Sequence, residues 1–388
     1  MLAEAEHRIA KHRDQPARPE ADILIVGPYP PPLGGVSSHV QRAADVLSES
    51  GYVVHVLNHF SSLVSGVVIG TLRRNPALYY LKLRKVDAKV VHYHHAGRLS
   101  LLLATALART NGDTRRIVTI HNHSLTRAFG LPIVARLVKA ALSRFDQIVA
   151  VSHEIKDVLE QHHINVPTVV MPAYISASAA NKAPVSDWLP APFFEGADIT
   201  LVVSAYRVTR WSSSRGDVYG LDVAAKVFTE LAMTMPDVKL AIFLAHTPKG
   251  RWAKRYLRST MQLISPELAD RVKLWVGEQL SPAFGYRTIY LRPTRTDGDA
   301  VSVREALDAG VPVIASDIVD RPPAVRTLAT DASSLWKTTI GEEVTRLSAK
   351  TAAVVHASRD NGHNESVDAI LGLYRTQLGL VAATRRER

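Results

Sequence analysis

The sequence contains no cysteine among its 388 residues. This absence excludes disulfide scaffolds, zinc sites with thiolate ligands, iron–sulfur clusters and cysteine nucleophiles. It also favours a cytoplasmic protein, because structural disulfides are typical of oxidising compartments.

Long apolar runs are absent as well. No segment approaches the roughly 18 to 20 consecutive apolar residues of a membrane helix. Where a signal peptide would need an apolar core, the first twenty residues carry charges at Glu4, Glu6, Arg8, Lys11 and Arg13. We therefore expect a chain that neither spans a membrane nor is exported by that route. Because hydrophobic residues make up 46% of the chain and charged residues 21%, the composition predicts a folded protein.

Acidic residues are outnumbered, 36 against 47 basic ones, which leaves a formal net charge of +11. Such a field favours nucleic acid, an anionic bilayer or phosphorylated substrates, and net charge alone does not separate these partners. Because no aromatic-bearing nucleic-acid motif accompanies the charge, no nucleic acid partner is expected.

Short β-branched runs alternate with amphipathic stretches of helical length in both halves of the chain. This alternation predicts an α/β fold with parallel sheets whose two faces are covered by helices. The predicted strands of the first half are 23–27, 52–57, 89–94, 116–121, 147–151 and 168–171. Those of the second half are 199–204, 239–244, 271–276, 288–291 and 311–315.

A proline-rich break with the composition of an interdomain linker lies between the halves, at Pro172, Pro184, Pro190 and Pro192. We predict an N-terminal extension at 1–20, expected to be mobile, a first domain at 21–180, a linker at 181–197, a second domain at 198–365 and a C-terminal helix at 366–388 that packs back on the first domain. Ligands of open α/β sheets bind beyond the carboxyl ends of the strands, so two facing sheets place the site in the cleft between them.

The loop after the first predicted strand reads GPYPPPLGGVSSH and leads into a predicted helix at 37–50. Gly34 and Gly35 have no side chains, which allows backbone N–H groups to approach an anion at the helix N-terminus. The loop lacks the G-x-G-x-x-G fingerprint of dinucleotide sites. Two interpretations stay open, a phosphate cradle and a tight turn that needs positive φ.

Three histidine clusters end predicted strands, at 92–95, 121–123 and 152–153. An H-x-H sequence with further histidines nearby can bind zinc in a hydrolase, since neutral imidazole is a common zinc ligand. No carboxylate neighbours these clusters in the sequence, so an acidic ligand would have to come from elsewhere.

Two longer segments carry a family resemblance. The stretch ILIVGPYPPPLGGVSSHVQRAADVLSESGYVVHVL and the stretch RPTRTDGDAVSVREALDAGVPVIASDIVDR at 292–321 are similar to the opening and the donor-binding segment of the retaining nucleotide-sugar glycosyltransferases of family 4. The second segment has two acidic residues separated by seven others, Asp297 and Glu305, before a small-G-x-P-V-I-A turn. The resemblance implies the GT-B fold, in which two Rossmann-like, doubly wound parallel-sheet domains face each other across a cleft.

The resemblance also implies roles for the donor-binding segment. Glu305 would accept hydrogen bonds from the nucleotide ribose, and Asp297 would contact hydroxyls of the transferred sugar. The backbone amides of Gly298, Asp299 and Ala300 would hold donor phosphates or sugar hydroxyls at a helix N-terminus. His121 would contact the sugar near the anomeric carbon.

Two departures from the family pattern bear on the donor. The first acid is usually glutamate in the family, whereas here it is Asp297, which is one methylene shorter. The family also commonly clamps the diphosphate with an arginine and a lysine. Arg207 matches the arginine, but Tyr219 precedes the helix-opening glycine where the lysine is expected. We hypothesise that Arg210 or Arg215 supplies the missing cation.

The prediction from the sequence is therefore a retaining, metal-independent glycosyltransferase of polysaccharide or glycolipid assembly. Its co-substrate would be a nucleoside-diphosphate sugar of UDP or GDP type, and no other cofactor is expected. Two alternatives remain, a non-catalytic protein that binds nucleotide sugars or polyanions on the same fold, and a zinc hydrolase.

Two basic, apolar helical stretches at 71–85 and 127–144 suggest a peripheral contact with an anionic membrane. The expected location is the cytoplasm, at the inner face of the plasma membrane, with a glycan or lipid-linked acceptor. The competing interpretation is that the apolar faces pack on the sheet and only the charges face water.

Overall fold

The computed structural model describes residues 20–30, 34–59, 67–71, 76–83, 87–95, 97, 99–108, 113–175, 191–211, 216–349 and 361–386. The predicted N-terminal extension lies outside these ranges except for Glu20, which begins the first strand. Residues 181–190 of the predicted linker and Arg215 also lie outside the described residues.

The first sheet is wholly parallel, in the order β3-β2-β1-β4-β5-β6-β7. Its strands are β1 (Glu20–Gly27), β2 (Val54–Asn58), β3 (Val68–Thr71), β4 (Asp87–His95), β5 (Arg115–Ile120), β6 (Gln147–Ala150) and β7 (Thr168–Val170). All the predicted strands of this half are present, and β3 is an additional short edge strand. The strand order reverses between β1 and β4, and such a switch point opens a crevice at the carboxyl ends of the strands.

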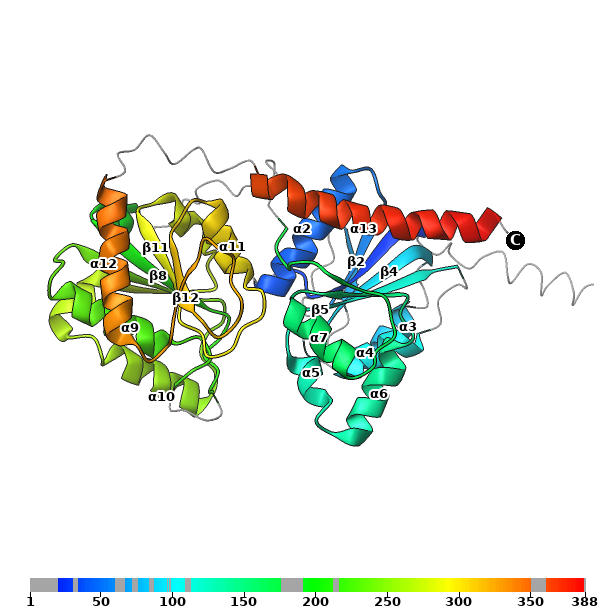
Figure 1. Ribbon diagram of the computed structural model, residues 1–388, viewed down its shortest axis with the longest axis horizontal. Helices are drawn as coiled ribbons and strands as arrows, with labels where there is room; N and C mark the ends of the chain where they lie inside the picture. Colours follow the sequence, from blue (N-terminus) through cyan, green and yellow to red (C-terminus); the bar gives the residue numbers. More distant parts are fainter. Residues whose placement is uncertain are drawn as a thin grey trace, which may run out of the picture.

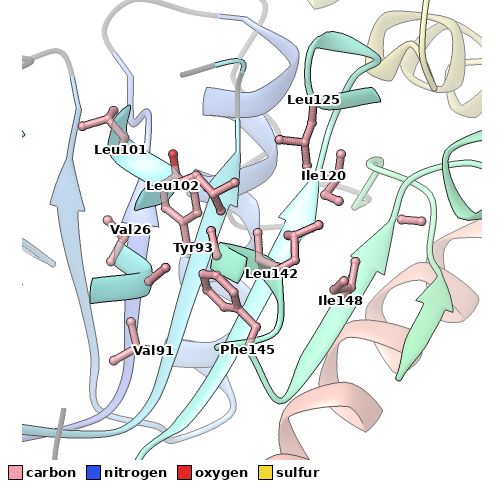
Figure 2. Close-up of a cluster of buried hydrophobic side chains, with 14 of the residues drawn as sticks. Val26, Val91, Tyr93, Leu101, Leu102, Ile120, Leu125, Leu142, Phe145 and Ile148 are labelled. Carbon is pink, nitrogen blue, oxygen red and sulfur yellow. The ribbon is translucent and has the colours of Figure 1, made fainter. Parts of the chain in front are cut away.

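Helices cover both faces of this sheet (Figure 1). They are α2 (Gly35–Glu49), α3 (Pro76–Leu83), α4 (Leu99–Leu107), α5 (Ser124–Ala128), α6 (Pro132–Leu142) and α7 (His153–Gln161). Side chains from α4 and α6 join those of β4, β5 and β6 in one buried cluster, shown in Figure 2 around Tyr93, Leu102 and Leu142. A second cluster, on the opposite face, includes residues of α2. Burial on both faces explains why the strands are almost continuously apolar in the sequence.

The second sheet is also parallel, in the order β10-β9-β8-β11-β12-β13. Its strands are β8 (Ile199–Ala205), β9 (Val238–Leu244), β10 (Val272–Val276), β11 (Thr288–Arg292), β12 (Val313–Ser316) and β13 (Arg326–Leu328). The helices are α8 (Ala191–Glu195), α9 (Leu221–Ala232), α10 (Gly250–Met261), α11 (Val301–Asp308) and α12 (Ser333–Ala349), with short 3-10 turns at Pro266–Arg271 and Ser281–Gly285. Only β13, three residues at the edge, has no counterpart among the predicted strands.

Part of the predicted linker is ordered structure, which corrects that prediction. Residues 191–195 form α8, and Phe194 is buried against Trp275 and Tyr286 of the second domain, with ring centroids 5.8 and 4.9 Å apart. Proline is tolerated in the first turn of a helix, so Pro192 does not prevent it. Burial of aromatic surface outweighs the local composition on which the linker prediction relied.

The C-terminal helix returns to the first domain. The helix α13 (Asn361–Arg386) begins before the predicted start at 366 and lies across the first sheet on the side of α2 (Figure 1). Ile370 and Tyr374 are buried among residues of β1, β4 and α2. The Tyr374 hydroxyl lies 2.5 Å from Nδ1 of His92, so the end of the chain contacts the strand that leads into the candidate site.

Candidate functional site

The carboxyl ends of the two sheets meet through the glycine loop of the first domain. Gly34 is extended, with φ 179°, and neither Gly34 nor Gly35 has positive φ in the left-handed region. A Cβ at Gly34 would lie 2.8 Å from the ring of Tyr206, and one at Gly35 would lie 3.6 Å from Val301. Of the two interpretations left open, the positive-φ turn is therefore wrong. The absence of a side chain at Gly34 permits the close approach of the second domain.

The donor-binding segment predicted from the sequence lies against His121. This residue follows β5, and its carbonyl oxygen would lie 3.1 Å from a Cβ placed at Gly298. Gly298 lies in the loop between β11 and α11, and Ala300 is the N-cap of α11. The structure therefore brings together the glycine loop, His121 and the start of α11, which are far apart in the sequence.

Three imidazoles from three elements meet beneath this contact. His39 of α2, His94 of β4 and His121 have ring centroids between 5.0 and 5.3 Å apart. Nδ1 of His94 lies 3.0 Å from Nε2 of His121. Nδ1 of His39 lies 2.6 Å from the carbonyl oxygen of Ala173, and because a carbonyl only accepts, this nitrogen carries the proton. The remaining nitrogen of His39 is then an acceptor.

Burial keeps this cluster neutral. Desolvation lowers the pKa of His39 to about 4 and holds the pKa of His94 and that of His121 well below the ordinary value. His92, stacked on His94 at 4.2 Å, has its pKa lowered by burial to about 3. At neutral pH these rings exchange hydrogen bonds without adding positive charge to the cleft.

The same three histidines could hold a metal ion. One nitrogen from each of His39, His94 and His121 lies within 4.8 Å of the other two. Neutral imidazoles suit zinc, and the bond from His39 to Ala173 is the kind of contact that orients a metal ligand. The group differs from the H-x-H motif considered in the sequence, since His123 is not part of it.

The carboxylate of Asp297 is fully occupied by neighbours in its own domain. Arg292 donates to both of its oxygens, at 3.0 and 3.1 Å, and Arg321 donates to Oδ2 at 3.0 Å. The hydroxyl of Thr294 and the amide of Gly298 also donate to it. The two guanidinium groups hold the pKa of Asp297 below its ordinary value, against the effect of burial. Asp297 therefore anchors the loop that precedes α11, and its contact with a sugar stays a prediction.

Sequence reasoning missed both arginines. Arg292 and Arg321 stand at the two ends of the quoted donor-binding segment, and that position was a usable signal. Their side chains are nearly buried, and buried guanidinium groups are normally paired.

The next acid of the loop, Asp299, joins the two domains. It pairs with Arg304 at 2.7 Å and accepts the amide of Ala173 of the first domain at 2.9 Å. Burial raises the pKa of Asp299 in spite of this arginine. Nearby, the hydroxyl of Tyr174 donates to Asp308 of α11 at 2.8 Å. The segment after β7 is therefore fastened to both ends of α11.

Glu305 is paired across the domain boundary. Nη2 of Arg42 in α2 lies 2.5 Å from Oε1 of Glu305, and both side chains are largely buried. Nη1 of Arg42 donates to the carbonyl of Ile175, and its guanidinium lies over the ring of Tyr174. Nothing in the spacing of the sequence pointed to Arg42, because its partner is 263 positions away.

The predicted diphosphate clamp is only partly placed. Arg207 and Arg210 are exposed at the end of β8, while Arg215 lies outside the described residues. Tyr219, where the family lysine is expected, packs its ring 5.2 Å from the guanidinium of Arg292. Gly220 is left-handed with φ 69°, and a Cβ there would lie 1.9 Å from the carbonyl of Pro293, so only glycine fits.

Comparisons with known proteins agree with this arrangement. Residues 33–176 match the family described as Glycosyltransferase Family 4. The chain belongs to glycosyltransferase family 4. Over 325 residues, this family 4 chain is 23% identical to a component of the phosphatidylinositol N-acetylglucosaminyltransferase of Homo sapiens. The match covers 74% of the chain and 60% of that human protein.

Solved structures confirm the GT-B fold of this family 4 chain. Sucrose-phosphate synthase from Thermosynechococcus elongatus superposes with a TM-score of 0.63 at 14% identity, over 95% of this chain and 100% of that one. HepE of Anabaena, solved with UDP and glucose, also gives 0.63 at 14% identity, over 92% and 99%. Among the described residues, no helix has the length and apolar character needed to cross a bilayer.

Proposed function

We propose that this chain is a retaining glycosyltransferase, which moves a hexosyl or related sugar from a nucleoside-diphosphate donor to a hydroxyl group. The acceptor would be a glycan or a lipid-linked sugar in polysaccharide or glycolipid assembly. The observation that carries the proposal is the contact of the donor-binding loop, at Gly298, with His121 of the facing domain. A protein of the same fold solved with UDP and glucose supports a donor of this class.

Each of these features of the cleft then has a chemical task. Glu305 accepts the ribose hydroxyls, while Arg207 and the backbone near Gly34 and Gly35 receive the departing diphosphate. His121 bonds a sugar hydroxyl near the anomeric carbon. Because its pKa is depressed, the ring is neutral and does not oppose the positive charge that develops on that carbon.

The reaction needs one bond exchange at the anomeric carbon. The bond from this carbon to the phosphate oxygen breaks, and the acceptor oxygen bonds to the carbon on the same face. The acceptor proton passes to an oxygen of the leaving diphosphate. The protein contributes positioning and charge stabilisation, so the scheme requires neither a divalent metal nor a resident cofactor.

The direct test is calorimetry with UDP and GDP, followed by assays of donor hydrolysis and transfer. We expect one nucleoside diphosphate to bind and its sugar conjugate to turn over. Proton NMR of the product should show the anomeric configuration of the donor. Failure of every nucleoside diphosphate to bind would remove the enzyme assignment, and an inverted product would remove only the retaining mechanism.

A non-catalytic nucleotide-sugar binding protein is the second candidate. It is favoured by the saturation of the Asp297 carboxylate and by Tyr219 in the place of the clamp lysine. Binding of UDP or GDP without transfer or hydrolysis, over a panel of sugar donors and acceptors, would select it.

Metal chemistry is the third candidate, and the group of His39, His94 and His121 favours it. Elemental analysis of purified protein decides whether the group holds zinc. Under the transferase proposal, dialysis against a chelator leaves donor turnover unchanged. Turnover that is lost with chelator and restored by zinc would contradict metal independence.

A further inference from the structure

Three neighbouring helices of the first domain carry no acidic residue. The helices α3 and α4 contact each other, as do α4 and α6, and together they cover the side of the sheet opposite α13 (Figure 1). Their sequences are PALYYLKL, LSLLLATAL and PIVARLVKAAL. The surface formed by these helices and by the residues directly after α4 and before α6 is called the α3–α4–α6 face below.

This face exposes an unusual number of large apolar side chains. Twelve such residues are exposed in the described part of the chain, and five of them lie on the α3–α4–α6 face: Leu81, Leu107, Leu131, Ile133 and Leu137. Ile133 and Leu137 are one helical turn apart and therefore point the same way. Ile133 is 76% exposed and Leu131 is 61% exposed, so these side chains protrude from the helices.

The apolar side of α6 is not needed to hold the helix in place. Val138, Ala141 and Leu142 are buried and pack α6 on the sheet. Packing of the apolar face, the interpretation that competed with membrane contact, thus accounts for one side of α6 only. Ile133 and Leu137 form a second apolar stripe on its outer surface.

Positive charges flank this stripe. Arg136 and Arg144 are exposed and Lys139 is half-buried. In the described ranges, none of these three side chains forms a salt bridge, while the nearby Asp146 is paired with Arg115 at 3.0 Å. An anionic surface would meet unneutralised cations and no carboxylate.

We propose that the α3–α4–α6 face docks on a bilayer that contains anionic lipid. Leu131, Ile133 and Leu137 enter the boundary between headgroups and acyl chains, and Arg136 and Lys139 bind lipid phosphates. A second copy of the chain is a poor occupant, because the same face would bring cation against cation. The turn between α5 and α6 follows His121 closely in the chain, so docking here holds the site near the lipid surface.

The test is flotation of the full chain with vesicles of phosphatidylcholine alone and with vesicles that contain about 30% phosphatidylglycerol, a share chosen to make polybasic contacts measurable. We expect at least tenfold stronger binding to the anionic vesicles. The double variant Ile133→Glu, Leu137→Glu should lose at least tenfold of this binding. Arg136→Glu with Lys139→Glu should remove the preference for anionic lipid.

The matched control places glutamate on the second domain, in Met233→Glu with Ile318→Glu, where the original side chains are 77% and 50% exposed. This control should bind vesicles as the unaltered chain does. Thermal unfolding and UDP or GDP binding of all variants should match those of the unaltered chain, which separates docking from the proposed catalysis.

Equal binding to both vesicle types, or equal loss in the control variant, would overturn the proposal. Size-exclusion chromatography adds a further outcome. A stable dimer that the Ile133→Glu, Leu137→Glu variant dissociates would show that the face binds a second copy, which also overturns the bilayer assignment.

Discussion

Arg42 and Glu305 join the two domains through a single ion pair, 2.5 Å long, between α2 and α11. The proposed function uses the same Glu305 carboxylate for the donor ribose. The nucleotide must therefore share Glu305 with Arg42 or displace it. This relationship ties donor binding to the contact between the domains.

Replacing the carboxylate should weaken nucleotide binding. Glu305→Gln keeps the shape but loses the charge, and hydrogen bonds to a charged group contribute about 1.5–3 kcal/mol. We expect the Kd of UDP or GDP, measured by calorimetry, to rise by about 10- to 100-fold. Asp308→Asn, on the same helix but bonded to Tyr174, is the control and should change this Kd less than threefold. Equal Kd values for Glu305→Gln and the unaltered chain would place the nucleotide elsewhere.

Removing the interdomain partner should loosen the cleft. Arg42→Ala deletes the bond to Glu305 and the bond to the Ile175 carbonyl. Small-angle X-ray scattering without nucleotide should show a larger radius of gyration than for the unaltered chain. Arg136→Ala, an exposed arginine far from this pair, should leave the radius unchanged. An unaltered radius in Arg42→Ala would mean that the other interdomain bonds are sufficient.

The arginines around Asp297 should matter for stability. Arg321→Met removes one partner of a buried carboxylate, and breaking a buried ion pair typically costs about 3–5 kcal/mol. Urea denaturation should show a loss of this order, or somewhat less because Arg292 still pairs with Asp297. The control is Arg326→Met, which breaks the exposed pair with Glu342 and should cost no more than about 1 kcal/mol. Similar losses in the two variants would contradict a buried anchor.

Arg207 should affect turnover more than folding, because its side chain is exposed. If it receives the leaving diphosphate, Arg207→Ala lowers kcat/KM for the donor by about 100-fold, the scale of one lost stabilising donor. Unfolding by urea should be unchanged. Arg210→Ala tests the hypothesis for the second cation by the same assay. Unaltered kinetics in Arg207→Ala would remove that residue from the site.

The buried histidines predict a pH-dependent stability. Burial lowers the pKa of His95 to about 4, as it does that of His39, from an ordinary value of 6.5. Between these values the unfolded chain binds a proton and the folded chain does not, so the free energy of unfolding falls as pH drops from about 6.5 to 4. Each such histidine contributes up to about 1.4 kcal/mol per pH unit.

Urea denaturation at several pH values checks this slope. His95→Gln should reduce it, while His153→Gln, at an exposed position, should not. The raised pKa of Asp217 and that of Asp299 act in the opposite sense, so the comparison is made between variants and not on the absolute slope. A slope unchanged in His95→Gln would show that this ring is accessible to protons in the folded chain.

Local pattern was sufficient for much of the fold. The buried strands β1, β4 and β8 were predictable because parallel strands covered on both faces are continuous apolar runs. The edge strands β3 and β13 were not, since three or four residues with little burial leave no such run. Helix α8 was missed because its prolines resemble a linker until Phe194 finds its aromatic partners.

The amino-acid sequence by itself determined the two-domain α/β architecture and the family, because periodicity and the Asp297 to Glu305 spacing are local properties of the chain. Only the tertiary structure decided that Asp297 is held by Arg292 and Arg321, that Arg42 reaches Glu305, and that His39, His94 and His121 form one neutral group. These partners are brought together by the crossing of strands and helices, and side-chain charge and burial depend on neighbours that no window of sequence contains.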